Sequence, residues 1–302
     1  MLSIILLQAL YGTSIPISKF LLSMCSPFFL TGIRMVSSGV LLLGYNWWMR
    51  KTKFIFNKKY IWLYVQIIVF GIYFKYLLRY WALSHLPAVK FSFMLNATPF
   101  LAALFSFIWF GTKLTKKQWA GLLLGFFGLV PIVVLRTQQE LLTTQLFFIS
   151  WPEIALFLAI VCHVYAMFIM QILIREHKSS VSGINGVCMF FGGILALTTI
   201  LFGHGSFVVT DVATFSLGLI ALILISNIIC QNWYIHLLKK YSVTFISLTD
   251  FINQLATIFY SWLFLKEVIT WHYGICAIIV FIGLYLFYQD ELQLTILELQ
   301  KP

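Results

Sequence analysis

Ten separate stretches of apolar residues dominate this sequence, and most of them are about 20 residues long. A helix of about 20 residues is long enough to cross the roughly 30 Å hydrocarbon core of a membrane. The stretches lie at about residues 3–22, 28–49, 60–83, 88–110, 117–135, 151–173, 181–202, 214–235, 243–264 and 270–288. They lack the strict alternation of a β-barrel. The sequence therefore predicts an all-α membrane protein with ten transmembrane helices.

The composition excludes several other classes of protein. Of the 302 residues, 61% are hydrophobic and 10% are charged, whereas a soluble chain is about half apolar and a quarter charged. A soluble enzyme and a disordered chain are thereby excluded. The net charge of +11 would suggest nucleic acid in a soluble protein, but basic loops account for it in a membrane protein. The expected partner is the lipid bilayer, with no nucleic acid.

The basic residues between the apolar stretches predict the orientation of the chain. The even-numbered connections hold twelve of them, and the odd-numbered ones, with their edges, hold four at most. The twelve are Arg50, Lys51, Lys53, Lys58, Lys59, Lys113, Lys116, Lys117, Arg175, Lys178, Lys239 and Lys240; the four are Arg136, Lys266, Lys19 and Lys90. Basic loops stay in the cytoplasm. We therefore expect a multi-pass protein of the cell (inner) membrane with both termini cytoplasmic.

The two halves of the chain resemble each other at a constant offset of 154 residues. Matching pairs include Tyr11 and Tyr165, Gly32 and Gly186, Val89 and Val243, Leu101 and Leu255, and Phe110 and Phe264. Each half would hold five helices, and an odd number turns the second half upside down in the membrane. The predicted units are residues 1–150 and 151–290, followed by a short cytoplasmic tail at 291–302. Inverted repeats are typical of secondary transporters, whose substrate site lies between the repeats near the midplane.

Several segments resemble the drug/metabolite transporter superfamily, EamA type. They are YGTSIPISK at 11–19, SPFFLTGIR at 26–34, ALSHLPA at 82–88, NATP at 96–99 and LTKKQWAG at 114–121. The last three of these form one block, which the second half repeats between residues 241 and 287. The resemblance covers about residues 3–288. It implies ten helices in two inverted repeats and alternating access to a central cavity. The chain departs from the family at Lys113, where Glu is common, and Asn253 stands where the first repeat has Pro99, so the fourth and ninth helices should bend differently.

Ionisable residues inside the apolar stretches are candidates for function, because a charge at the bilayer centre costs roughly 2.5–3.5 kcal/mol on insertion scales. Lys75 and Arg79 are four residues apart and share one helical face, with Lys75 the more deeply placed. Arg79 either faces the cavity or reaches the outer headgroups. Asp250 either pairs with a basic group, binds a substrate ammonium or carries a coupling proton. His163 is either a core residue or a second proton-coupling group, and Arg34 is expected to be a structural charge.

Neutral polar residues on the first, third, fourth, eighth and ninth stretches complete the predicted site. The expected substrate-binding residues are Lys75, Arg79, Tyr76, Tyr11, Asn96, Asn227, Gln231, Asp250 and Asn253. In a membrane such residues also serve as contacts between helices. A basic, aromatic-lined cavity suits an amino-acid-like zwitterion, including S-adenosylmethionine, whose adenine would stack and whose sulfonium would lie near a ring.

The sequence thus predicts a secondary transporter of a small polar metabolite. The alternatives are an exporter of aromatic amino acids or drugs, and an intramembrane enzyme, although the sequence lacks HExxH, GxSxG and paired membrane aspartates. The five cysteines show no metal-binding spacing and no P-loop is present, so no metal and no cofactor are expected. The protein is a monomer or a homodimer on this interpretation.

Overall fold

The computed structural model describes residues 2–49, 60–111, 114–131, 145–146, 149–176, 181–202, 205–239, 241, 243–267 and 271–299. Several basic residues used to predict the orientation lie outside these ranges, as does Lys113. Within them the chain is helical, apart from a small antiparallel ribbon of β1 (Gln145–Leu146) and β2 (Ile149–Ser150).

Helix is present in every one of the ten apolar stretches. The first half holds α1 (Leu2–Gly12), α2 (Ser14–Leu22), α3 (Pro27–Met49), α4 (Ile61–Gln66), the π-helix η2 (Ile67–Phe74), α5 (Lys75–His85), α6 (Ala88–Leu95), α7 (Ala97–Phe110) and α8 (Lys116–Phe127). The second half holds α10 (Trp151–Glu176), α11 (Val181–Leu201), α12 (Val212–Ala221), the π-helix η4 (Leu222–Cys230), α13 (Gln231–Leu238), α14 (Val243–Leu265) and α15 (Trp271–Leu299).

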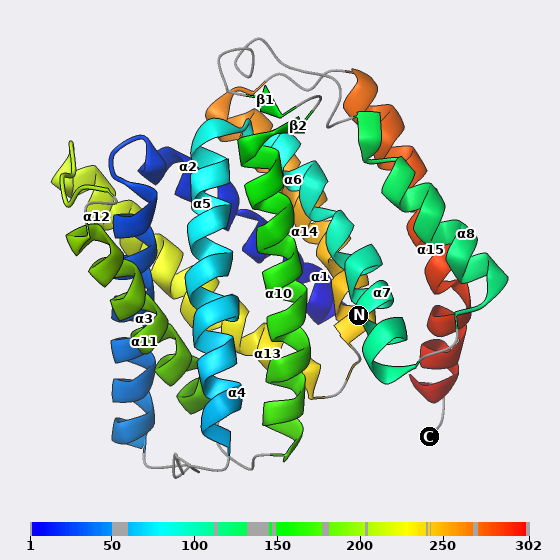
Figure 1. The fold of residues 1–302 in the computed structure, drawn as a ribbon, viewed down its shortest axis with the longest axis horizontal. Coiled ribbons are helices and arrows are strands. Elements are labelled where there is room, and N and C mark those ends of the chain that lie inside the picture. The colour runs from blue at the N-terminus through cyan, green and yellow to red at the C-terminus, as the bar shows by residue number, and fades with distance from the viewer. Residues whose placement is uncertain are drawn as a thin grey trace.

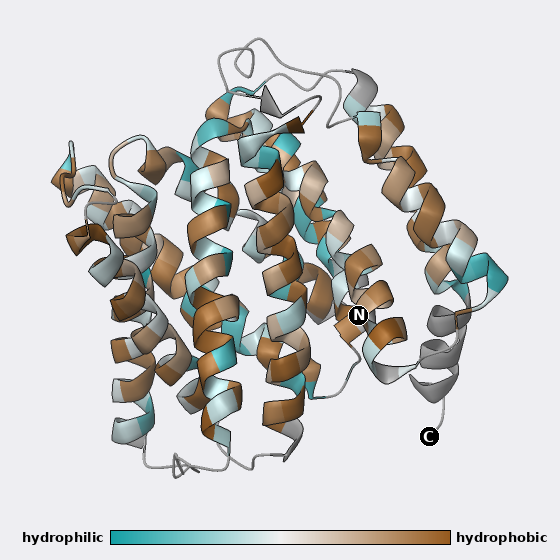
Figure 2. Cartoon of the chain, viewed as in Figure 1, coloured by the Kyte–Doolittle hydropathy of each residue, from teal (hydrophilic) through white to brown (hydrophobic). Residues whose placement is uncertain are grey.

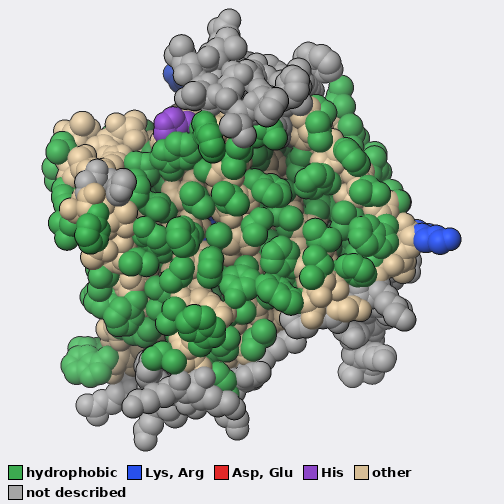
Figure 3. Space-filling view, in the orientation of Figure 1, with side chains coloured by type: hydrophobic (Ala, Val, Ile, Leu, Met, Phe, Trp, Pro, Cys, Tyr) green, Lys and Arg blue, Asp and Glu red, His purple; other side chains and the backbone are tan. Residues whose placement is uncertain are grey.

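Seven helical segments among the described residues are long and apolar enough to cross a membrane. They cover the first four and the sixth to eighth predicted stretches, from Ile4–Leu22 to Val212–Leu238. In the tenth stretch, Tyr273–Gln289 is apolar but shorter. Figure 2 shows hydrophobic residues along most of the helices, and Figure 3 shows hydrophobic side chains over most of one face. Large apolar side chains such as Trp47, which is 80% exposed, are suited to contact with lipid.

The helices of the two halves pack against each other in pairs. Figure 1 shows α3 beside α11 at one edge of the molecule and α8 beside α15 at the other. Between these pairs, α5 packs on α10 and α1 packs on α14. The core therefore lies between segments that are far apart in the sequence.

Glycines permit the close contact between α3 and α11. A Cβ atom on Gly39 would lie 2.6 Å from the backbone nitrogen of Phe190, and one on Gly193 would lie 2.6 Å from that of Val36. Any larger residue would push the two helices apart. Small residues have this role in membrane helix pairs, because close backbone approach maximises van der Waals contact.

A proline, Pro99, breaks the helix of the fourth stretch. Pro99 has no N–H to donate to the carbonyl of Leu95, and the Thr98 hydroxyl donates to that oxygen instead, at 2.7 Å. The break between α6 and α7 falls at Asn96. The ninth stretch, with Asn253 at the equivalent position, is the single helix α14. The prediction that these two helices bend differently is confirmed.

The third and eighth stretches each contain a π-helical segment at nearly the same place in the two halves. η2 ends where α5 begins at Lys75, and η4 ends where α13 begins at Gln231. π-helical turns are rare and frequently lie at functional sites. Both segments lead directly into residues that line the central cavity.

Candidate functional site

A cavity of about 60 Å³ lies at the centre of the bundle. Both halves of the chain contribute to its wall. The lining residues are Tyr11, Ser14, Ile15, Ser18, Arg34, Lys75, Tyr76, Arg79, Tyr80, Leu83, Leu95, Thr98, His163, Ser226, Gln231, Tyr234, Asp250, Asn253 and Gln254. The volume is well below the roughly 300 Å³ of a small-molecule site. A metabolite can therefore enter only when the helices move apart.

Two cationic side chains lie against the ring of one tyrosine in this cavity. The Lys75 ammonium lies 4.2 Å from the centre of the Tyr76 ring, and the Arg34 guanidinium lies 5.5 Å from the same ring. Arg79 lies 5.5 Å from the ring of Phe91. Cation–π contacts offset only part of the cost of burying an ammonium or guanidinium group. The wall is therefore strongly positive and favours a solute that brings a carboxylate.

Arg34 is fixed by neutral hydrogen-bond acceptors. Its Nε donates to Asn227 Oδ1 at 2.6 Å, one terminal nitrogen donates to Ser226 Oγ at 2.7 Å, and the other donates to the Tyr80 hydroxyl. These bonds connect α3 to η4 and α5. The structural role of Arg34 stays a prediction, and its side chain also forms part of the cavity wall.

Asp250 is held by neutral partners rather than by a basic group. Gln8 Nε2 donates to its Oδ1 at 2.8 Å, and the Tyr234 hydroxyl donates to its Oδ2 at 3.3 Å. No ion pair of Asp250 is found among the described residues. The predicted structural ion pair is thus not seen there. The carboxylate lines the same cavity as Lys75 and Arg79, so the two signs of charge face one small space.

The structure brings most of the predicted site residues together. Those that line the cavity are Tyr11, Lys75, Tyr76, Arg79, Gln231, Asp250 and Asn253, with His163 and Arg34 beside them. Asn96 is buried at the break between α6 and α7, and Asn227 contacts Arg34 and the sulfur atoms of Met35 and Met189. Neither of these two asparagines lines the cavity.

Sequence reasoning missed Tyr234, which both lines the cavity and holds Asp250. A signal for it was present, because Tyr234 follows Tyr80 at the same offset of 154 residues. Both tyrosines line the cavity. Tyr80 accepts a hydrogen bond from Arg34, and Tyr234 donates one to Asp250. Ser226 was also missed, and no pattern in its apolar surroundings marked it.

Two charged residues hold the turn between α5 and α6 at one end of the bundle. Lys19 Nζ donates to the carbonyl oxygens of Leu83, at 2.8 Å, and Leu86. Glu267 accepts hydrogen bonds from the backbone N–H groups of Ala88 and Val89, both at 2.8 Å. A carboxylate at the first turn of a helix is favoured by the helix dipole. Lys19 and Glu267, which we call the end clamp, thus hold both sides of the turn between α5 and α6.

A buried ion pair involves the first turn of α6, next to the turn that the end clamp holds. Lys90 on α6 approaches Glu153 on α10 at 2.7 Å, and both side chains are almost fully buried. Glu153 also accepts from the backbone N–H of Ser150 at 2.6 Å. The start of α10 is therefore tied to α6 at this end. Figure 1 shows this end opposite the one where α3, α10 and α13 end.

The model of the EamA-like transporter family matches residues 1–134 and 150–289. The chain belongs to this family. The match confirms the resemblance to the drug/metabolite transporter superfamily. With seven helical segments apolar enough to cross a membrane among the described residues, the protein is a transmembrane protein of a transporter family.

Similar proteins come from Chlamydia. The S-adenosylmethionine/S-adenosylhomocysteine transporter of Chlamydia muridarum is 28% identical over 261 residues, which cover 85% of this chain and 81% of the relative. The transporter of the same name from Chlamydia trachomatis serovar L2 is 27% identical and is covered to 79%. The fold is similar to that of a protein of known crystal structure, with a TM-score of 0.69 and 15% sequence identity. The match covers 96% of this chain and 97% of the other chain. That likeness shows the fold.

Proposed function

We propose that this protein is a secondary transporter of S-adenosylmethionine and S-adenosylhomocysteine. The supporting observation is that Asp250 and the cations Lys75 and Arg79 line one cavity between the two halves of the chain. The names of the chlamydial relatives point to the same solutes.

The charges of the cavity match the amino-acid end of these solutes. Lys75 and Arg79 would bind the carboxylate through charge-assisted hydrogen bonds. Asp250 would bind the ammonium group from the opposite side of the cavity. The rings of Tyr76 and Tyr234 offer π faces to the sulfonium of S-adenosylmethionine. Arg34, already held by three neutral partners, would keep the wall in place and add positive potential.

The proposed architecture is ten membrane crossings in two inverted five-helix repeats, residues 1–150 and 151–290. The helix contacts support it, because they come in pairs that exchange under the repeat. The first and ninth stretches pack together as α1 on α14, and the equivalent sixth and fourth stretches pack as α10 on α6 and α7. The π-helices η2 and η4 occupy nearly equivalent positions. Rocking of one repeat against the other would give alternating access.

The proposed location is the inner membrane of the cell. The proposed orientation places both termini in the cytoplasm. The basic residues of the even-numbered connections support this orientation. The end clamp would then lie on the outer side of the membrane. The solute would be carried without chemical change, so the protein would not act as an enzyme.

Counterflow into liposomes tests the proposal directly. Purified protein is reconstituted with unlabelled S-adenosylmethionine inside, and labelled S-adenosylmethionine is added outside. We expect saturable uptake that S-adenosylhomocysteine inhibits and that leaves the solute chemically intact. Inhibition by phenylalanine or tryptophan without inhibition by S-adenosylhomocysteine would contradict the proposal, and so would covalent conversion of the label.

A further inference from the structure

A second cavity of about 40 Å³ adjoins the central one. The two share four wall residues, which are Lys75, His163, Gln231 and Tyr234. The remaining wall of the second cavity is mostly apolar and consists of Ile67, Gly71, Ile72, Ala166, Met167, Met170, Asn185, Ile235 and Leu238. Leu238 and Asn185 lie near the ends of α13 and α11 that are opposite the end clamp. A long solute can therefore extend from the central cavity in this direction.

Asn185 is the polar side chain in this otherwise apolar part of the wall. It is 1% exposed, and its Oδ1 atom has no hydrogen-bond partner among the described residues. Within the described part of the chain, its Nδ2 atom has a single long contact, of 3.4 Å, with Asn232 Oδ1. Leaving a buried acceptor unpaired costs about 1–3 kcal/mol. The Oδ1 atom can thus accept from a ligand and Nδ2 has a second N–H to donate, which suits a ligand that offers a donor and an acceptor side by side.

We propose that the second cavity binds the adenine ring of the solute, with Asn185 as the residue that recognises it. This inference rests on the proposed function. An asparagine amide pairs with adenine through two hydrogen bonds, accepting from the N6 amino group and donating to N7. The side chains of Ile72 and Ile235 provide apolar contact for the ring. The amino-acid end of the same solute occupies the central cavity, between Lys75 and Asp250.

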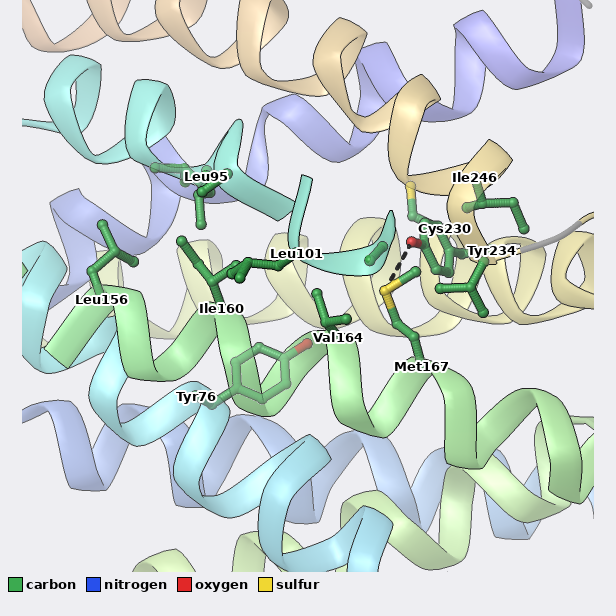
Figure 4. Packing of buried hydrophobic residues seen from close by; sticks show 14 of the residues in the cluster. Tyr76, Leu95, Leu101, Leu156, Ile160, Val164, Met167, Cys230, Tyr234 and Ile246 are labelled. Atoms are coloured by element: carbon green, nitrogen blue, oxygen red, sulfur yellow. Dashed lines mark hydrogen bonds between the residues drawn. The ribbon is translucent and has the colours of Figure 1, made fainter. Parts of the chain in front are cut away.

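Met167 and Met170 in the wall of the second cavity would move to accommodate the base. Figure 4 shows Met167 on α10 facing Tyr234 on α13, and the Tyr234 hydroxyl lies 3.6 Å from the sulfur of Met167. Methionine has three rotatable bonds and repacks readily around ligands. Movement of Met167 and Met170 would enlarge the cavity and release the Tyr234 hydroxyl. The ribose would then lie between the cavities, next to the shared residues His163 and Gln231.

Competition between two solutes that differ only in the base tests the inference. The experiment compares S-adenosylhomocysteine with S-inosylhomocysteine as inhibitors of S-adenosylmethionine counterflow. In S-inosylhomocysteine a carbonyl oxygen replaces the N6 amino group. We expect wild-type protein to prefer the adenosyl compound by about 10-fold or more, since a bidentate pair is worth roughly 1–3 kcal/mol. Equal inhibition by the two compounds, with counterflow intact, would overturn the inference and leave the proposed function standing.

Variants of Asn185 assign the preference to this residue. Asn185→Leu should reduce the ratio of the two inhibition constants to near one, and the smaller polar variant Asn185→Ser should do the same if the leucine variant does not fold. Asn232→Leu is the matched control. It removes the contact to Asn185 Nδ2 but leaves the amide in the cavity wall, so the ratio should persist. A ratio that survives in both Asn185 variants would overturn the inference. Absence of S-adenosylmethionine and S-adenosylhomocysteine counterflow in wild-type protein would instead refute the proposed function, and the inference with it.

Discussion

The Thr257 hydroxyl on α14 donates a hydrogen bond to the carbonyl oxygen of Gly12 at 3.0 Å. The two residues are 245 positions apart in the sequence. Pro16 is four residues after Gly12 and has no N–H with which to satisfy this carbonyl. Thr257 therefore supplies the bond that the proline removes, and it fixes the break between α1 and α2 against the ninth stretch.

Replacing Thr257 by Val should destabilise the protein, because the Gly12 carbonyl would be buried without a partner. The expected loss is about 1–3 kcal/mol in the free energy of unfolding, measured by thermal unfolding of the purified protein in detergent. Thr257→Ser keeps the hydroxyl and should remain close to wild type. If the Val and Ser variants unfold at the same temperature, the hydrogen bond has no part in stability.

Gly12→Ala should impair the same contact by a steric route. A Cβ atom at Gly12 would lie 2.7 Å from the Cβ of Ala256 and 3.1 Å from the backbone nitrogen of Thr257. Overpacking of this kind costs typically 1–3 kcal/mol. We expect lower yield of folded protein and a lower unfolding temperature. Gly44→Ala is a suitable control, because a Cβ there meets nothing within 4 Å.

Neutral substitutions of Lys75 and Asp250 should separate the two ends of the zwitterion. Asp250→Asn keeps the size of the side chain and should weaken binding of the ammonium by about 10-fold or more, whereas Lys75→Gln should weaken binding of the carboxylate. The readout is inhibition of counterflow by S-adenosylhomocysteine analogues that lack one charge. Each variant should lose its preference only for the charge that its own residue binds. Unchanged transport in both variants would remove them from the site.

Weakening the end clamp should open the side of the bundle that it closes. Glu267→Gln removes the carboxylate that accepts from Ala88 and Val89, and Lys19→Met removes the donor to Leu83 and Leu86. In either variant, a cysteine introduced at Ser18 of the cavity wall should react faster with a water-soluble thiol reagent. Lys117→Gln changes a charge on the exposed start of α8 and should leave this rate unchanged. If the cysteine reacts at the same rate in the Glu267→Gln, Lys19→Met and Lys117→Gln variants, the end clamp does not restrict access to the cavity.

The predicted orientation can be tested by labelling intact cells with a membrane-impermeant maleimide. Ser206→Cys should be labelled, whereas Lys117→Cys and Lys239→Cys should be labelled only after the cells are opened. The native Cys25 adds little background, because burial raises the pKa of its thiol to about 12 and the thiolate is the reactive form. Its labelling should rise with pH throughout the range from 7 to 9. Labelling of Lys239→Cys in intact cells would reverse the orientation.

The sequence alone was enough to predict the helical segments and about half of the cavity wall. Helical segments follow from long apolar stretches, because hydrocarbon tolerates few charges. Their ends do not always follow, since α15 continues to Leu299 through most of the predicted tail. Lys75, Arg79, Asp250 and Gln231 were predictable for the same reason, since polar groups within such stretches turn toward the interior. The different bending of the fourth and ninth stretches followed from Pro99, whose missing N–H is a local property of the chain.

The tertiary structure decided which side chains meet. It pairs Asp250 with Gln8 and Tyr234 rather than with a cation, and it places Asn227 on Arg34, outside the cavity. It also joins Asn185 to the second cavity. A uniformly apolar background leaves the rotation of each helix about its axis unmarked in the sequence. The partners of these groups depend on how helices hundreds of residues apart pack, and only the folded bundle fixes that packing.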